Sequence, residues 1–148
     1  LYGLDTVALR YFNVYSEDQQ YGGSYSTVIA AWMEMLRQNK PLRVDGDGKQ
    51  TRDFIHIDDI IDANIFCMNC EDSMHGSSFD VGTGIETSLN QVQEIVKQHC
   101  DAQWEDSQPR IGDIKFSKAN TLGLERKGWK AKVNIVEGLT KCFGGNNE

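Results

Sequence analysis

Residues 6–14 read TVALRYFNV, a nearly continuous run of β-branched, aliphatic and aromatic side chains. A strand that faces water on one side alternates apolar and polar residues, whereas a strand covered on both faces does not. The run therefore predicts a strand that is buried on both faces, as in a parallel sheet. A chain built around such a strand is expected to be an α/β protein.

Helical and strand-like patterns alternate along the rest of the chain. Short strands are expected at residues 41–44, 54–57 and 78–82. Helices are expected at residues 25–38 with Ser24 or Ser26 as the cap, from Asp58 or Asp59 to about Asn69, and at residues 89–99 with Ser88 as the cap. Further helices are expected near residues 121–127 and 136–143. With no repeat or linker, residues 1–148 are expected to form one unit without a separate second domain.

Charge and apolar content exclude several classes of protein. Fifteen basic and 22 acidic residues give a net charge of −7, which argues against nucleic acid as the partner. No apolar run approaches the roughly 20 residues of a membrane span, so no membrane partner is expected. The chain begins at Leu1, already within a pattern, and we expect it to be part of a longer protein.

The four cysteines include one C-x-x-C pair, Cys67 and Cys70, which is compatible with a zinc or redox site. A zinc site would need a second pair at similar spacing, but Cys100 and Cys142 stand alone. We therefore favour small core and surface residues and expect no metal. Reduced thiols without a signal segment indicate the cytoplasm.

Three polar residues are candidates for binding an anionic ligand. Arg52 follows a glycine-rich turn at the mouth of a strand, where its guanidinium could bind two phosphate oxygens, or could pair with Asp53 or Asp58 instead. Arg110 lies on a loop, as a second cation or as a solvated side chain. Asn13 ends the buried strand, where ligands of α/β sheets bind, although it could also be a turn cap.

Five motifs occur in order along the chain: LRYFNVY, GxYSxVI, PLxVxGDGxQTRDFIHIDDI, FDVGTG and PRxGDI. This series resembles the carboxyl-terminal half of the extended short-chain dehydrogenase/reductases that act on nucleotide sugars. Within them the chain is most similar to the UDP-sugar 4-epimerases, particularly the branch that handles N-acetylated hexosamines. The resemblance covers Thr6 to about Gly138. It implies the last parallel strands of an extended Rossmann-type fold plus a small substrate-binding region.

The resemblance also implies the residues that bind the nucleotide sugar. Arg52 and Arg110 would contact the diphosphate, Asn13 would lie near it, and Asp113 would touch the ribose. Two arginines and a helix start agree physically with a doubly charged diphosphate.

The other implied contacts lie around the sugar and the base. Tyr11 would lie near the sugar and the nicotinamide of the cofactor NAD. Thr27 and Val28 would sit beside the nucleotide at the start of a helix, and Leu89 would pack by the uracil. The chain departs from the family at Asp45, where an aromatic residue often lies under the base, and at Glu17, in a segment that usually carries a glycine and a cation.

Two family motifs are missing from these 148 residues: the G-x-x-G-x-x-G turn that holds the NAD pyrophosphate and the catalytic Tyr-x-x-x-Lys pair. In the family both precede the LRYFN strand. The resemblance thus implies a UDP-sugar-binding half of an NAD-dependent 4-epimerase, without catalytic residues or NAD binding of its own. The alternatives are a fragment of a dehydratase or decarboxylase of the same superfamily, and a non-enzymatic binding module. Strands without their neighbours would also favour a homo-oligomer.

Overall fold

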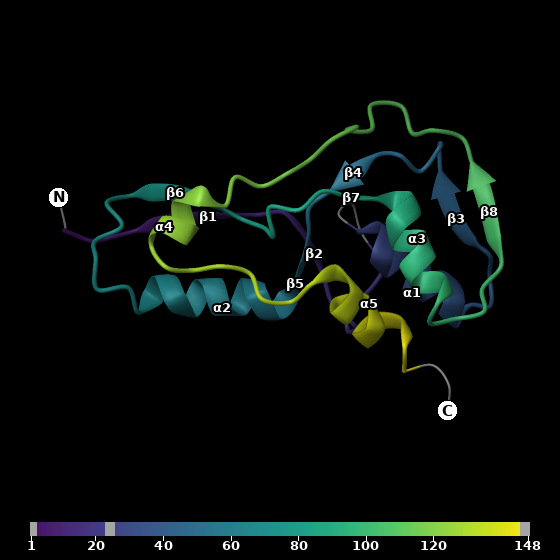
Figure 1. Cartoon of the computed structure of the whole chain (residues 1–148), viewed down its shortest axis with the longest axis horizontal. Helices are drawn as coiled ribbons and strands as arrows, with labels where there is room; N and C mark the ends of the chain where they lie inside the picture. Colours follow the sequence, from purple (N-terminus) through teal and green to yellow (C-terminus); the bar gives the residue numbers. More distant parts are fainter. Residues whose placement is uncertain (1–2, 23–25, 146–148) are drawn as a thin grey trace.

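The computed structural model describes residues 3–22 and 26–145 (Figure 1). The strands are β1 (Val7–Tyr11), β2 (Asn13–Tyr15), β3 (Leu42–Asp45), β4 (Thr51–Arg52), β5 (Phe54–His56), β6 (Ser77–Val81), β7 (Thr87–Ser88) and β8 (Trp104–Ser107). The helices are α1 (Val28–Arg37), α2 (Ile57–Met68), α3 (Leu89–Lys97), α4 (Leu122–Arg126) and α5 (Ile135–Phe143).

Parallel strand pairs confirm the expected α/β class. Among the described residues, β1 pairs with β6, β2 with β5 and β3 with β8, all in parallel, while β4 and β7 are antiparallel. Each pair forms its own two-stranded sheet.

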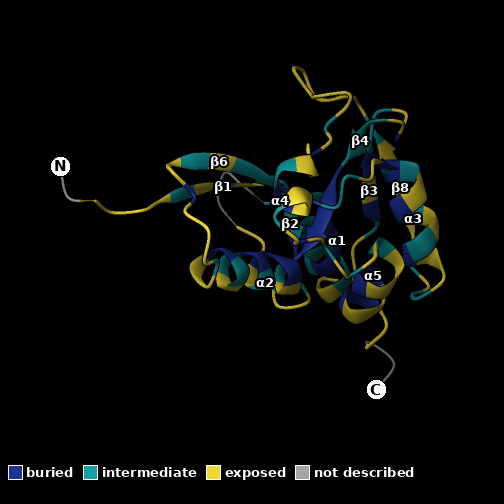
Figure 2. Ribbon diagram, turned by 60° about the vertical axis from the view of Figure 1, so that its left-hand side comes forward, coloured by how far each residue is buried: buried dark blue, intermediate teal, exposed yellow. Residues whose placement is uncertain are grey.

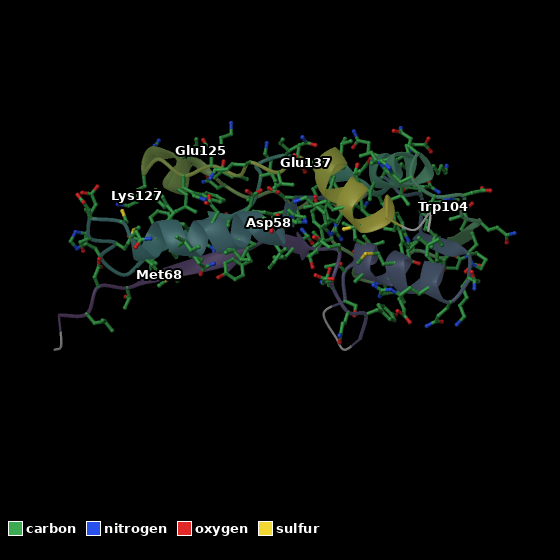
Figure 3. All side chains as sticks on the ribbon, turned by 90° about the horizontal axis from the view of Figure 1, so that it is seen from below. Asp58, Met68, Trp104, Glu125, Lys127 and Glu137 are labelled. Atoms are coloured by element: carbon green, nitrogen blue, oxygen red, sulfur yellow. The ribbon has the colours of Figure 1, made fainter. Side chains whose placement is uncertain are left out.

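The molecule is elongated, with β1, β6, α2 and α4 toward one end and β3, β8, α1 and α3 toward the other (Figure 1). Figure 3 shows Met68, at the end of α2, and Trp104, at the start of β8, at these opposite ends. Each end has its own apolar cluster. One cluster centres on Trp32, Val92 and Phe143, and the other on Ile55, Val81 and Leu124. Helices α2 and α3 bury the side that faces the molecule and expose the other (Figure 2).

The first strand differs from the sequence prediction in two ways. It is divided at Phe12, because the chain changes partners there: Phe12 N donates to Val81 O of β6, whereas Asn13 N donates to Asp53 O next to β5. It is also not buried on both faces, since Ala8 and Tyr11 are exposed. In the described part of the chain β1 pairs with β6 alone, so its second edge has no strand neighbour.

Helix caps were predicted with mixed success. Ser88 caps α3 as expected, in a reciprocal capping box with Gln91. The predicted cap of the first helix is wrong, because Thr27 Oγ1 accepts from Ala30 N; Ser24 lies outside the described residues. For α2 the cap is His56, whose Nδ1 accepts from Asp58 N, and not Asp58 or Asp59.

Buried aspartates tie distant segments together. The Asp53 side chain is fully buried and accepts from Thr83 N, Thr83 Oγ1, Gly84 N and Ala119 N. A Cβ added at Gly82 would lie 2.4 Å from the Ala119 Cβ, so this approach requires glycine. Asp59, also buried, accepts from Lys132 N and so holds the extended chain before α5.

Helix α5 packs against Tyr15 in the first apolar cluster. All four cysteines are free thiols. A Cβ at Gly138 would lie 2.0 Å from Tyr15 Oη, so the helix approaches the ring through its glycine. Burial raises the pKa of Cys142 on the same helix to about 12, and it also raises the pKa of Cys67.

Replacing Asp53 with alanine is expected to lower the free energy of unfolding by about 3–5 kcal/mol, since several buried N–H groups lose their acceptor. Urea unfolding would measure the change. The control is Glu94→Ala, which removes an exposed pair with Lys97 and should change stability by less than about 0.5 kcal/mol. Equal effects of the two substitutions would contradict this role of Asp53.

Alkaline pH is expected to destabilise the fold partly through Cys142. An unfolded thiol ionises at about pH 8.5, whereas burial raises the pKa of the folded Cys142 thiol to about 12. The free energy of unfolding should thus be undiminished below the lower value and fall as the pH rises toward the upper one. Urea unfolding at about pH 8 and about pH 10.5 should show a smaller loss for Cys142→Ala than for the wild type. Cys70→Ala is the control and should retain the wild-type loss; equal losses in all three proteins would refute the role of Cys142.

Candidate functional site

A cavity of about 430 Å³ opens between α1, β3, β4 and residues 110–113 of the segment that follows β8. In Figure 1 this segment, drawn in green, runs past β4 on its way to α4. Seven of the eight residues expected at the nucleotide sugar line this cavity: Asn13, Thr27, Val28, Arg52, Leu89, Arg110 and Asp113. The structure therefore brings together residues that lie up to 100 positions apart in the sequence.

The amino-terminal end of α1 forms one wall. Thr27 is the N-cap, and its Oγ1 also donates to Gln19 Oε1 at 3.0 Å, which fixes the entry to the helix. The first turn carries no acidic residue. Unpaired backbone N–H groups and the helix dipole at such an end favour an anion.

Asn13 lines the cavity and is oriented by two hydrogen bonds. Its backbone N and its Nδ2 both donate to Asp53 O, at 3.1 and 3.0 Å. It begins β2, so the alternative of a turn cap is wrong. Because Nδ2 is used in this way, the orientation of the amide is set by Asp53.

Arg52 ties β4 to the segment that follows β8. Its Nη2 donates to Asp113 Oδ1 at 2.6 Å, and its Nη1 donates to Thr51 O and Ile114 O. The predicted alternative partners, Asp53 and Asp58, are wrong: Asp53 is occupied by backbone groups, and Asp58 pairs with Lys141. The Arg52 side chain remains 20% exposed and lines the cavity.

Arg110, Arg43 and Asp45 form a second network that also lines the cavity. Arg110 Nε donates to Asp45 Oδ2 at 2.5 Å, and Arg43 Nε lies 2.9 Å from Asp45 Oδ1. Arg110 is thus not simply a solvated cation. Sequence reasoning missed Arg43, although β3 carries a signal: Leu42 and Val44 are buried, so Arg43 and Asp45 share the opposite face.

The remaining wall is apolar and includes Trp32, Met35, Phe54 and Leu89. Leu89 N donates to Gln50 O, which fixes the start of α3 against the turn after β3. A cavity with an apolar wall and a few convergent charged groups has the usual character of a small-molecule site.

Tyr11 is the one predicted site residue that does not line this cavity. It lies on β1, 48% exposed, and its Oη donates to Asn64 Oδ1 of α2 at 3.0 Å. It lines a separate cavity of about 420 Å³ between β1 and α2, together with Cys67 and Met74.

The described residues 3–22 and 26–145 contain neither a metal-binding cluster nor a membrane-spanning helix. They contain no group of three or more histidine, cysteine, aspartate or glutamate side chains that could hold a metal ion. No helix among them has the length and apolar content needed to cross a membrane.

Residues 1–82 match the family model described as NAD dependent epimerase/dehydratase family. The chain is 32% identical over 143 residues to a putative UDP-glucose 4-epimerase of Methanocaldococcus jannaschii, covering 95% of this chain and 45% of that protein. It is 31% identical over 125 residues to a UDP-N-acetyl-alpha-D-glucosaminuronate decarboxylase of Bacillus cytotoxicus, covering 84% of this chain and 36% of that protein. The chain spans about half the length, or less, of these curated relatives.

Solved structures show the same relationship. A UDP-glucose 4-epimerase of Thermotoga maritima with UDP-glucose matches at a TM-score of 0.83 and 33% identity, covering 97% of this chain and 46% of that one. A UDP-N-acetylglucosamine 4-epimerase of Methanobrevibacter ruminantium M1, in complex with UDP-N-acetylmuramic acid, matches at a TM-score of 0.84 and 30% identity with the same coverage.

Proposed function

The chain belongs to the NAD-dependent epimerase/dehydratase family, and we propose that it is the nucleotide-sugar-binding portion of a UDP-sugar 4-epimerase. One observation carries the proposal: a single cavity joins a helix start, several guanidinium groups and an apolar wall. These features match the parts of a nucleoside diphosphate, because cations and a helix start favour phosphate and apolar side chains favour a base.

In this proposal each lining residue contacts a particular part of the ligand. Arg52 and Arg110 bind the diphosphate, Asn13 lies close to it, and Asp113 touches the ribose. At the other wall, Thr27 and Val28 lie beside the nucleotide and Leu89 packs against the uracil.

The described residues do not fit NAD. The sequence has neither the glycine-rich turn nor the Tyr-x-x-x-Lys pair. Tyr11, which we place near the sugar and the nicotinamide of a whole enzyme, donates from its Oη to Asn64 Oδ1. In a whole epimerase NAD would accept and return the hydride while a tyrosine moves the hydroxyl proton. We propose that these 148 residues only bind the nucleotide sugar, and that the cytoplasm is their location.

A decarboxylase of the same family is the second candidate, supported by the relative from Bacillus cytotoxicus. The two reactions would use the same kind of nucleotide-sugar binding site and differ in their acid and base residues. Among the described residues that line the cavity there is no histidine, and the carboxylates are Asp45 and Asp113, which are both paired with arginines. The residues of this binding site therefore favour neither reaction over the other.

Arg52→Ala is expected to weaken UDP binding by roughly ten- to hundred-fold, since a charge-assisted hydrogen bond is lost. Arg52→Lys should restore it only in part, because a point charge cannot fork onto two oxygens. Calorimetric titration with UDP, with melting curves for each variant, would test this. The control is Arg37→Ala, which removes an exposed arginine paired with Glu34 on α1, outside the cavity. Lower melting temperatures with unchanged affinity in both Arg52 variants would assign Arg52 to the loop alone.

We also propose that the chain self-associates. Strand β1 has one unpaired edge among the described residues, and Ile61, Ile65 and Met68 of α2 are at least half exposed. Pairing of edges between copies would satisfy these backbone groups and cover apolar surface. Sedimentation velocity should show dimers or larger species that increase with concentration. A single monomeric species over a wide concentration range would rule this out.

A further inference from the structure

Arg43 gives the cavity a third guanidinium group, beyond the two that the motifs indicate. It lines the cavity together with Arg52 and Arg110. Strand β3 directs Arg43 and Asp45 to the same face, since the side chains between and before them, Val44 and Leu42, are buried in the apolar cluster. The position of Arg43 is therefore fixed by strand geometry.

Asp45 lies between two of the arginines. Its Oδ1 is 2.9 Å from Arg43 Nε, and its Oδ2 accepts from Arg110 Nε at 2.5 Å. The Asp45 side chain is only 13% exposed, whereas those of Arg43 and Arg110 are 42% and 66% exposed. One largely buried carboxylate thus anchors two more exposed guanidinium groups.

The three arginines differ in which nitrogens are already used. Arg52 uses Nη1 for two carbonyl oxygens and one N–H of Nη2 for Asp113, which leaves Nε and the second N–H of Nη2 for a ligand. Arg110 donates through Nε to Asp45, and Arg43 Nε forms an ion pair with Asp45 at 2.9 Å. Within the described residues the terminal amines of both arginines make no hydrogen bond. A guanidinium held in this way keeps its terminal amines for a second anion.

We propose that Asp45 is a positioning residue that presents the terminal amines of Arg43 and Arg110 to the ligand, and that Arg43 is a further anion-binding residue for the diphosphate. The inference rests on the proposed function, because it takes a nucleoside diphosphate as the ligand. It adds a contact at Arg43 and a role for Asp45 at the position where the family often has an aromatic residue.

Electrostatics alone predicts the opposite effect of Asp45. The lining residues include three arginines and two aspartates, so the cavity has one net positive charge. If Asp45 contributed only its charge, Asp45→Asn would strengthen the binding of a diphosphate, because a like charge would be removed. If Asp45 orients the arginines, the same substitution weakens binding. The sign of the change therefore separates the two roles.

The test titrates the 148-residue chain with UDP, inorganic pyrophosphate and uridine by calorimetry, with melting curves throughout. Asp45→Asn and Arg43→Ala should each weaken UDP and pyrophosphate about tenfold and leave uridine binding unchanged. In the Arg43→Ala/Arg110→Ala background, adding Asp45→Asn should no longer weaken UDP binding and should leave it equal or tighter. This change of sign is not expected if Asp45 only stabilises the fold.

The matched control is Arg10→Ala. Arg10 Nε donates to Asp80 Oδ1 at 2.7 Å, the same kind of pair, but outside the cavity, and its loss should leave UDP affinity unchanged. Because Arg43 is partly exposed, Arg43→Ala tests the proposal even if Asp45→Asn fails to fold.

The outcomes separate this inference from the function on which it rests. If Arg52→Ala weakens UDP binding while Arg43→Ala and Asp45→Asn do not, the role of this network is refuted and the nucleotide site stands. Equal weakening of uridine and UDP by Arg43→Ala would also refute a diphosphate contact. If the wild-type chain binds neither UDP nor pyrophosphate, the proposed function and this inference both fail.

Discussion

The buried carboxylate of Asp53 is the interaction on which the arrangement of both ends depends. Its side chain accepts backbone N–H groups from the turn after β6 and from Ala119, while its carbonyl oxygen accepts from both nitrogens of Asn13. Its chain neighbours, Arg52 and Phe54, line the cavity. The same residue therefore joins β2, β5 and β6 and sets the position of the cavity wall. A buried carboxylate with this many donors specifies one arrangement, because any other would leave polar groups unpaired.

Aspartates explain how an acidic chain can contain an anion site. Several of the 22 acidic residues act inside the structure: Asp53 and Asp59 bind backbone N–H groups, and Asp45 and Asp113 bind arginines. The arginines offset the charges of Asp45 and Asp113, and the backbone N–H groups stabilise the carboxylates of Asp53 and Asp59 by hydrogen bonds. The net charge of the chain therefore does not predict the sign of the charge in the cavity. The described residues that line the cavity carry one net positive charge.

Local signals predicted much of the fold, and contacts between distant segments account for what was missed. Short stretches of sequence contain the signals for the alternation of strands and helices, for the cap at Ser88 and for the family motifs. The family and the parallel α/β class that they predict are confirmed. The first helix was assigned to the wrong cap because serine and threonine compete at residues 24–27, and only the chain path selects Thr27. The pairing of Arg110 with Asp45 links residues 65 positions apart, and no motif contains both.

The strand pairing has a consequence for how the chain reaches this structure. Val7 pairs with Ser77 and Leu42 with Trp104, and no pair among the described strands is a hairpin. Each sheet must close a long loop before its first hydrogen bond forms, which places such topologies among the slower folders. During synthesis at about 5–20 residues per second, β1 would wait roughly 4–14 seconds for β6 to appear. Throughout that interval its edge is open to nascent neighbours and to chaperones.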